Sequence, residues 1–290
     1  MTEGFLNILK PPGMSSHDVI SVARRVLSIK KIGHAGTLDP GAAGVLPVAV
    51  GRAARLVEYL SDADKSYRAE LTLGIATDSG DDTGNIIASQ EDFTLPSPQE
   101  LDAVLQQFTG EILQVPPAYS AIKIHGQRAC DLARQNIAVE IPERRVQIYR
   151  LELLAQRGNT LLLDVDCSKG TYIRTLCADL GRALGIPATM SFLVRTRVGD
   201  FSLASSCTLE ELAAQGPAAL LPAEDFLSHL PAYTMADHRV KAFLNGLGTN
   251  DWNFSGTEDQ LLRVYGDGRF LGIGRFDAAE QSIIPEKVFY

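Results

Sequence analysis

The chain has 290 residues, of which 45% are hydrophobic and 21% are charged. These are ordinary globular proportions, and a chain this long buries about three quarters of its unfolded surface, so intrinsic disorder, a collagen repeat and a coiled coil are excluded. The 27 Lys and Arg against 35 Asp and Glu give a net charge of −8, which argues against a non-specific nucleic-acid coat but allows an RNA enzyme with a local basic face.

The first residues and the cysteines predict a cytoplasmic protein. Residues 1–13 show no basic segment followed by an apolar one, so no secretory signal is expected. The apolar stretch 42–57 is interrupted by glycines, a proline and arginines, so no membrane span is expected either. The cysteines form no Cys-x-x-Cys pair and predict reduced thiols without a structural zinc site: Cys130, Cys167, Cys177 and Cys207.

The apolar pattern of the first hundred residues predicts both helices and strands. Residues 17–29 carry apolar side chains at helical spacing, directly behind two serines. Residues 67–73 alternate as in a strand with one buried face. A second helix is expected over 97–108, because Ser97 and Glu100 have the spacing of a capping box.

The same pattern continues in the second half of the chain. Residues 161–167 alternate as another half-buried strand, and residues 171–184 follow as a helix that stops at Gly185. Ser168 is expected to cap this helix, which would place Arg174 in its second turn. The elements show no regular βαβ alternation, so the α+β class is favoured over a doubly wound sheet.

Three prolines between residues 216 and 231 predict a domain boundary, with one domain over 1–231 and another over 232–290. In the second domain, two strand-like runs flank Gly266-Asp267-Gly268, which is expected to form a three-residue hairpin loop. This pattern indicates a small β-rich module that is docked on the larger domain.

The most unusual segment covers residues 33–48 and reads GHAGTLDPGAAGVLPV. Its glycines and alanines allow a backbone or a ligand to approach closely. Asp39 is the one carboxylate in the segment, and Pro40 keeps it away from the helical region. For an isolated Asp-Pro pair, the ordinary interpretation is a cap on the next turn.

The whole segment, however, resembles the catalytic motif of the TruB family of tRNA pseudouridine synthases. Further motifs of that family are matched in order by residues 10–16 (KPPGMSS), 64–68 (DKSYR), 117–123 (PAYSAIK), 169–176 (KGTYIRTL) and 193–197 (LVRTR). The resemblance implies a mixed, largely antiparallel sheet with an RNA-contacting insertion at about 117–150. The tail resembles a PUA RNA-binding domain, on the strength of the hairpin and Ile284-Pro285.

The resemblance also implies roles for individual residues. Asp39 matches the nucleophile, Arg174 the arginine that pairs with it, and Tyr67 the tyrosine that stacks on the target base. His34 matches the histidine that helps to extrude the nucleotide. Leu193 falls near a leucine that lines the base pocket, although this chain reads Leu-Val-Arg where the family often has Leu-Arg-Arg.

The chemistry of these residue types is consistent with the implied roles. Pseudouridine arises when N1–C1′ breaks and C5–C1′ forms, so no cofactor or metal is expected, and the sequence contains neither GxGxxG nor a P-loop. An ionised carboxylate can act as a covalent nucleophile, and a nearby cation lowers its pKa. Without the resemblance, Arg174 would be interpreted as a surface helix residue, Tyr67 as a core residue and His34 as a packed histidine.

The resemblance implies that the substrate is the uridine at position 55 in the T stem-loop of tRNA, whose single-stranded bases can be splayed out. The resemblance implies no protein partner, and the sequence does not indicate an oligomeric state. Between residues 123 and 150, six Lys and Arg against three acids predict phosphate contacts, unless these charges form a solvated helix face and strand edge.

Three other functions are considered. A guide-RNA-dependent pseudouridine synthase subunit has a similar motif, but this chain lacks Lys-rich tails. A tRNA-binding folding factor without catalysis is disfavoured by the intact Asp39, Tyr67 and Arg174. A metal hydrolase is disfavoured because no two histidines lie within six residues of each other, and the acidic run 78–82 predicts a turn between strands rather than a calcium loop.

Overall fold

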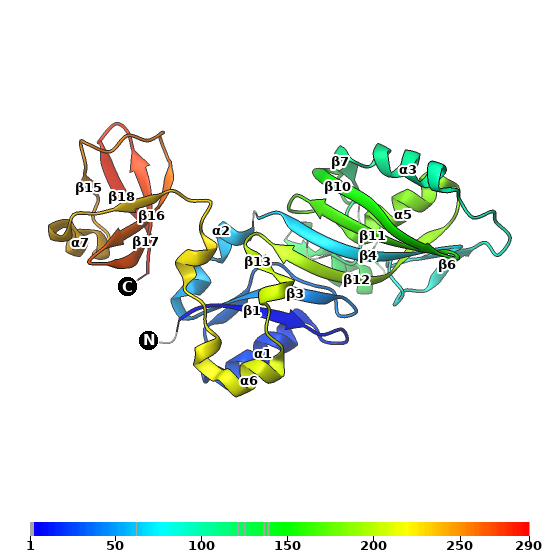
Figure 1. Cartoon of the computed structure of the whole chain (residues 1–290), viewed down its shortest axis with the longest axis horizontal. Coiled ribbons are helices and arrows are strands. Elements are labelled where there is room, and N and C mark those ends of the chain that lie inside the picture. The colour runs from blue at the N-terminus through cyan, green and yellow to red at the C-terminus, as the bar shows by residue number, and fades with distance from the viewer. Residues whose placement is uncertain are drawn as a thin grey trace.

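A computed structural model describes residues 3–61, 63–120, 122–124, 126–135, 137 and 140–289. Its larger sheet has nine strands in the order β1-β3-β12-β4-β11-β10-β7, with β2 beside β3 and β13 beside β12 (Figure 1). The bounds of these strands are β1 (Gly4–Lys10), β2 (Ile32–His34), β3 (Ala43–Val50), β4 (Lys65–Leu73), β7 (Gly110–Gln114), β10 (Arg144–Arg157), β11 (Thr160–Cys167), β12 (Ala188–Val198) and β13 (Phe201–Ser202).

Strand β12 joins the two halves of this sheet. It pairs antiparallel with β4 along most of its length and parallel with β3 at Val194↔Ala43 and Arg195↔Gly44. The other pairings in the sheet are antiparallel. The predicted α+β class and the mixed, largely antiparallel sheet are therefore confirmed. The two predicted strands, at 67–73 and 161–167, are confirmed as the paired neighbours β4 and β11.

The helices begin where the sequence offers a side chain to cap them. Ser15, Ser97 and Thr208 each form a capping box, so the helices predicted near residues 17 and 97 are confirmed. The helices are α1 (Ser16–Leu27), α2 (Val57–Ser61), α3 (Pro98–Gln107), α4 (Ala129–Arg134), α5 (Ile173–Leu184), α6 (Leu209–Gln215) and α7 (Asp237–Leu244). Short 3-10 turns cover Gly51–Arg55, Leu203–Ser205, Gly216–Ala219 and Ala223–Phe226.

The predicted start of α5 is wrong. The helix begins at Ile173, and its N-cap residue is Tyr172 rather than Ser168. Ser168 is instead tied to the sheet, because its Oγ accepts a hydrogen bond from the Gln147 amide at 2.9 Å. Gly170, with φ +80°, turns the chain between Ser168 and the helix, so Arg174 lies in the first turn and not the second.

Helices cover the sheet in two places. The apolar side of α5 packs, together with α3, on β4, β10, β11 and β12, where Tyr67, Leu71 and Leu73 of β4 are buried. α1 packs on β1 and β3, and Leu212 of α6 joins that cluster. Leu38 and Ala42, from the segment between β2 and β3, belong to the first of these clusters.

A second, five-stranded sheet follows from Ala232 in the order β14-β16-β17-β18-β15 and lies at one end of the molecule (Figure 1). Its strands are β14 (Ala232–Thr234), β15 (Thr249–Asn250), β16 (Leu261–Gly266), β17 (Arg269–Asp277) and β18 (Ser282–Val288). Phe270 and Ile273 of β17 share a buried cluster with Phe5 and Phe201 of the larger sheet.

The predicted hairpin is present, but its loop is shorter than expected. Gly266 pairs with Arg269, so only Asp267 and Gly268 form the loop. Both have positive φ, at +50° and +71°, as the two central residues of a type I′ turn require. This tight turn matches the twist of the two strands. Because Gly266 pairs with Arg269, it belongs to β16 rather than to the loop.

Two short hairpins lie outside these sheets. β5 (Ile75–Thr77) pairs with β6 (Ile86–Ser89), and β8 (Lys123–Ile124) pairs with β9 (Gln127–Arg128) in the segment between β7 and β10. Residues 144–150, which were expected to belong to the insertion, lie in β10. Within the described residues, no helix is both long and apolar enough to cross a membrane.

Candidate active site

A pocket of about 350 Å³ opens between the β2–β3 segment, the first turn of α5 and strands β4 and β12. Four of the residues implied by the family resemblance line it: Asp39, Tyr67, Arg174 and Leu193. Residues that had no expected role line it as well, among them Lys65, Tyr119, Tyr172 and Arg195. The fold thus brings together side chains from five separate stretches of the chain.

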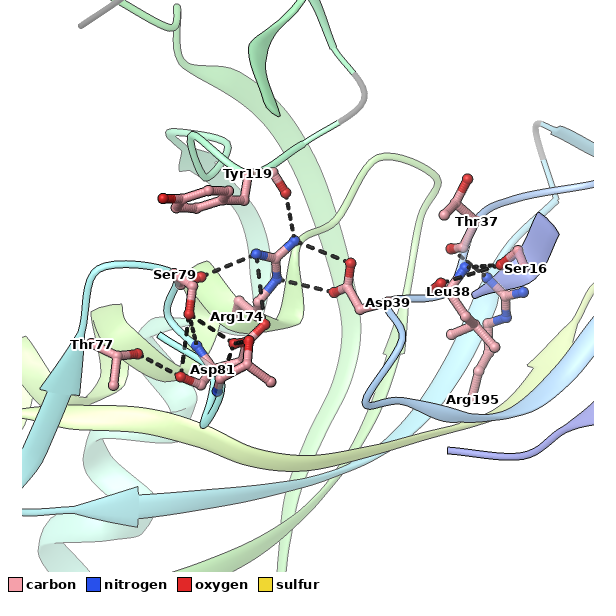
Figure 2. A network of polar contacts seen from close by, with 11 residues as sticks. Ser16, Thr37, Leu38, Asp39, Thr77, Ser79, Asp81, Tyr119, Arg174 and Arg195 are labelled. Carbon is pink, nitrogen blue, oxygen red and sulfur yellow. Dashed lines mark hydrogen bonds and ion pairs between the residues drawn. The ribbon is translucent and has the colours of Figure 1, made fainter. Parts of the chain in front are cut away.

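Asp39 and Arg174 form a two-pronged ion pair (Figure 2). Nε of Arg174 lies 3.0 Å from Oδ2 of Asp39, and Nη2 donates to Oδ1 at 3.3 Å. The remaining donors of Arg174 bind the carbonyl oxygens of Ser79 at 3.0 Å and Tyr119 at 2.9 Å. Arg174 is only 6% exposed, so its guanidinium is held in one orientation.

A second carboxylate lies on the other side of Arg174. Oδ2 of Asp81 is 3.8 Å from Nη1 of Arg174, and its Oδ1 accepts hydrogen bonds from Ser79 Oγ and Thr83 Oγ1. Asp81 belongs to the turn between β5 and β6, which confirms the interpretation of residues 78–82 as a turn. Its contact with Arg174 was not predicted, because it joins residues 93 positions apart.

The surroundings of Asp39 shift its pKa in opposite directions. Burial raises the pKa of Asp39 above its usual range, and the charge of Arg174 opposes this effect. Asp81 raises the pKa of Asp39 further, while Lys10 lowers it. The Asp39 side chain is still 37% exposed, so a substrate can reach it from the pocket. An ionised carboxylate that is desolvated, oriented and accessible is suited to nucleophilic attack.

Two buried cations hold the segment that carries Asp39. Arg195, which is 1% exposed, donates to the carbonyl oxygens of Val45 at 2.8 Å, Gly36 at 3.1 Å and Thr37 at 3.3 Å. Lys10 donates to the carbonyl oxygen of Pro40 at 3.2 Å, and burial lowers its pKa to about 8. Neither residue was assigned a role from the sequence, although both lie in quoted motifs.

Gly44 explains part of the glycine content of this segment. Its φ is +115°, and a Cβ at this position would lie 2.2 Å from the carbonyl oxygen of Arg195. Only glycine therefore allows β3 to come this close to β12. The close approach expected from the glycine-rich motif is confirmed at this position.

Tyr67 and Leu193 lie on neighbouring strands β4 and β12, where Tyr67 is opposite Arg195 and Leu193 is opposite Ala69. Both are largely buried in the core, and both line the pocket. Burial raises the pKa of Tyr67, with Arg195 opposing, so its ring is a neutral surface in front of Asp39. The expectation that Tyr67 serves the core and the pocket together is consistent with this placement.

His34 is placed differently from the other four residues. It ends β2, and its ring meets that of His17 edge to face, with centroids 5.7 Å apart. Burial lowers the pKa of His34, which favours the neutral imidazole. His34 does not occur among the described residues that line the pocket.

The expected basic segment is only partly described. Arg145 pairs with Glu111 at 2.6 Å, and Arg150 pairs with Asp164 and Asp166 on β11, so these charges are compensated within the sheet. Ala121 of the 117–123 motif lies outside the described residues, as do the side chains of Lys123, Arg128 and Arg134. Of the described residues, no three His, Cys, Asp or Glu lie close enough together to hold a metal ion.

Comparisons with known proteins agree with the motifs. Residues 24–173 match the N-terminal domain of the TruB family pseudouridylate synthases, and residues 174–228 match the tRNA pseudouridylate synthase B C-terminal domain. The tRNA pseudouridine synthase B of Caldanaerobacter subterraneus is 46% identical and covers 99% of each chain. That of Symbiobacterium thermophilum is 51% identical over 84% of this chain and 82% of its own.

A solved structure is similar over the whole chain. A chain of an H/ACA RNP bound to a substrate RNA containing 2′-deoxyuridine superposes with a TM-score of 0.76 and 27% identity. The match covers 100% of this chain and 86% of that one.

Proposed function

The chain belongs to the TruB family of pseudouridylate synthases, and we propose that it converts uridine 55 in the T loop of tRNA to pseudouridine. Relatives across nearly the whole chain are tRNA pseudouridine synthases, so the chain is a pseudouridine synthase that acts on tRNA. The position and the loop come from the family resemblance. The observation that carries the proposal is the Asp39–Arg174 pair at the pocket.

The reaction needs one nucleophile and no net supply of atoms. Asp39 attacks either C1′ of the ribose or C6 of the base, the N1–C1′ bond breaks, and the base rotates before C5–C1′ forms. The bond between Asp39 and the substrate then breaks, which regenerates the free carboxylate. The proton leaves C5, and N1 carries a proton in the product. Arg174 contributes by holding both carboxylate oxygens of Asp39 and by favouring its ionised form.

The pocket explains why the target must leave its stack. Asp39 lies beside a buried floor of Tyr67 and Leu193, which a base inside a helix could not reach. Flipping costs a few kcal/mol, and stacking on an aromatic ring returns about 1–3 kcal/mol. We assign the stacking contact to Tyr67 and the pocket wall to Leu193. His34, outside the pocket, is assigned to the extrusion step.

The rest of the RNA contact is assigned to two further parts of the chain. Residues 117–143, between the sheet strands, would contact the T stem-loop, and residues 232–290 would add a PUA-like contact to the tRNA end. The chain is acidic overall, so such contacts rely on local cations and on backbone and aromatic groups. Because the proposed substrate is tRNA, we assign the reaction to the cytoplasm. The proposed reaction needs no protein partner.

A guide-RNA-dependent reaction is the second candidate, favoured by the structural likeness to the H/ACA RNP chain. The identity to that chain, of which 86% is covered, is 27%, against 46% to a tRNA pseudouridine synthase B of which 99% is covered. The direct action on tRNA is therefore the better supported of the two. A binding protein without catalysis would not need the Asp39–Arg174 geometry.

The test is to incubate the pure protein with an unmodified tRNA transcript and to map pseudouridine by position. The wild-type protein should modify position 55 alone, without guide RNA. Asp39→Ala should abolish turnover while tRNA affinity stays within a few fold, and Asp102→Ala, on the exposed side of α3, should match the wild type. Turnover by Asp39→Ala would exclude Asp39 as the nucleophile, and modification only with guide RNA would favour the second candidate.

A further inference from the structure

The first turn of α5 is held differently from the starts of α1, α3 and α6. In those three helices, the acidic residue at the third helical position accepts a hydrogen bond from the N-cap amide, at 2.8 Å in each case. In α5 the N-cap residue is Tyr172, and the third helical position is Thr175. Thr175 does not close a capping box: its hydroxyl donates to the carbonyl oxygen of Val115 at 3.2 Å, and the Tyr172 amide donates to Gln114 instead.

Gln114 takes the place of the missing acidic residue. It is the last residue of β7, it is 1% exposed, and its Oε1 accepts a hydrogen bond from the Tyr172 amide at 3.0 Å. Its Nε2 also donates to the Tyr172 carbonyl oxygen at 3.4 Å. The cap of α5 is therefore supplied by a strand 58 positions away rather than by the helix itself.

Residues 114–119, which begin with the last residue of β7, bind the start of α5 at three points. Gln114 binds Tyr172, the Val115 carbonyl oxygen accepts from Thr175, and the Tyr119 carbonyl oxygen accepts from Arg174 at 2.9 Å. Arg174 is only two residues beyond Tyr172. A shift of the Tyr172 backbone would therefore displace the guanidinium that binds both oxygens of Asp39.

We infer that Gln114 is a positioning residue for the reaction, which fixes the first turn of α5 so that Arg174 meets Asp39 with both prongs. The inference rests on the proposed function for its kinetic part. Gln114 does not occur among the described residues that line the pocket, so it acts through Tyr172 and Arg174 rather than on the substrate.

A purely structural role would satisfy the Tyr172 amide without influencing Asp39. The two roles differ in their effect on the pKa of Asp39. Arg174 opposes the effect of burial on that pKa, so a displaced Arg174 leaves the carboxyl with a higher pKa. A structural defect elsewhere in the sheet would lower stability without this change.

The experiment compares Gln114→Leu with two further variants and a control. Leu is similar in size but makes neither hydrogen bond, and Gln114→Glu keeps the acceptor for the Tyr172 amide. Gln114→Asn keeps the amide on a side chain that is one methylene shorter. The control Gln156→Leu removes a hydrogen bond from a half-buried glutamine on β10 to Pro96, away from α5.

Two measurements are made on each folded variant: the pKa of Asp39 in the free enzyme, by carbon NMR titration, and kcat and KM on tRNA. For Gln114→Leu we expect a higher Asp39 pKa, a fall in kcat of about 10- to 100-fold and a KM within a few fold of wild type. Gln114→Glu should recover most of kcat, and Gln156→Leu should match the wild type in both measurements. If Gln114→Leu does not fold, Gln114→Asn should show the same two changes.

The outcomes separate the two proposals. If Gln114→Leu or Gln114→Asn keeps the wild-type Asp39 pKa and kcat, the inference about Gln114 is overturned while the proposed function stands. If the Asp39 pKa rises as expected but the wild-type protein forms no pseudouridine, the positioning by Gln114 stands and the proposed function fails.

Discussion

Two buried arginines face the same pocket and are bound in different ways (Figure 2). Arg195, on β12, donates to three main-chain carbonyl oxygens, those of Gly36, Thr37 and Val45, and its side chain also contacts that of Tyr67. Arg174, on α5, divides its donors between carbonyl oxygens and the carboxylate of Asp39, with Asp81 nearby. The first arginine therefore holds the shape of a segment, and the second determines the charge and direction of one carboxylate.

Lys10 and Ser16 also bind the main chain of the segment that carries Asp39. Lys10 donates to the Pro40 carbonyl oxygen, and the Ser16 hydroxyl both donates to the Leu38 carbonyl oxygen and accepts from the Leu38 amide. These bonds surround Asp39 without touching its carboxylate. The comparison predicts that the two buried arginines have separable effects, one mainly on stability and one mainly on turnover.

The largest effect is expected from Arg174→Lys. A lysine keeps the charge but cannot bind both oxygens of Asp39, so kcat should fall by about 10²- to 10³-fold. The free energy of unfolding should change less than in Arg195→Lys, because water can reach the partly exposed Asp39. Single-turnover assays and chemical denaturation measure the two quantities. Arg182→Lys, on the exposed side of α5, is the control.

Arg195→Lys should lower the free energy of unfolding more, and kcat less, than Arg174→Lys does. A lysine satisfies fewer of the three carbonyl oxygens, so the free energy of unfolding should fall by about 2–4 kcal/mol. Displacement of the Asp39 segment should reduce kcat by about tenfold. The control is Arg197→Lys on the same strand. A larger loss of kcat here than in Arg174→Lys would show that the two arginines do not differ as proposed.

The smallest effect is expected from Asp81→Asn, which tests the carboxylate beyond Arg174. Asp81 raises the pKa of Asp39, so its removal should lower that pKa. With Asp39 as the proposed nucleophile, we expect turnover to require its ionised form, so kcat/KM should fall as the pH drops through the pKa of Asp39. The acidic limb of the pH profile should therefore move to lower pH in Asp81→Asn, with a loss of plateau kcat of about tenfold or less from weaker support of Arg174.

The exposed neighbour Asp82→Asn provides the matched control, and it should keep the wild-type profile. If the acidic limb of the pH profile of Asp81→Asn moved to higher pH, the contact of Asp81 with Arg174 would affect the pKa of Asp39 more than the direct charge of Asp81 does. The contrast between the two arginines would then have to include Asp81 as part of the positioning of Arg174.

The sequence predicted the parts of the fold that depend on near neighbours. The capping box at Ser97 and the alternation in β4 and β11 are local patterns, and they lie where the sequence placed them. The start of α5 was misplaced because Ser168 has a good N-cap side chain. The turn at Gly170 and the cap from Gln114 could not be deduced from spacing alone.

The site was predictable only where a motif matched a known family. Asp39 and Arg174 were singled out in this way, and the structure places them together. Arg195, Asp81 and Gln114 were not singled out, because each acts through a residue far along the chain. A buried arginine in a strand does have one local signal, the alternation that places Leu193 and Arg195 on the same side of β12.

The cluster shared by the two sheets has a consequence for how the protein is made. Phe5 of β1 packs with Phe270 and Ile273 of β17, and Phe289 lies against the same cluster. A ribosome makes about 5–20 residues per second, so the segment around Phe5 waits about 15 to 60 s for its last apolar neighbours. During synthesis this edge of the larger sheet is therefore exposed to chaperones, and the cluster closes only after the final strands have left the ribosome.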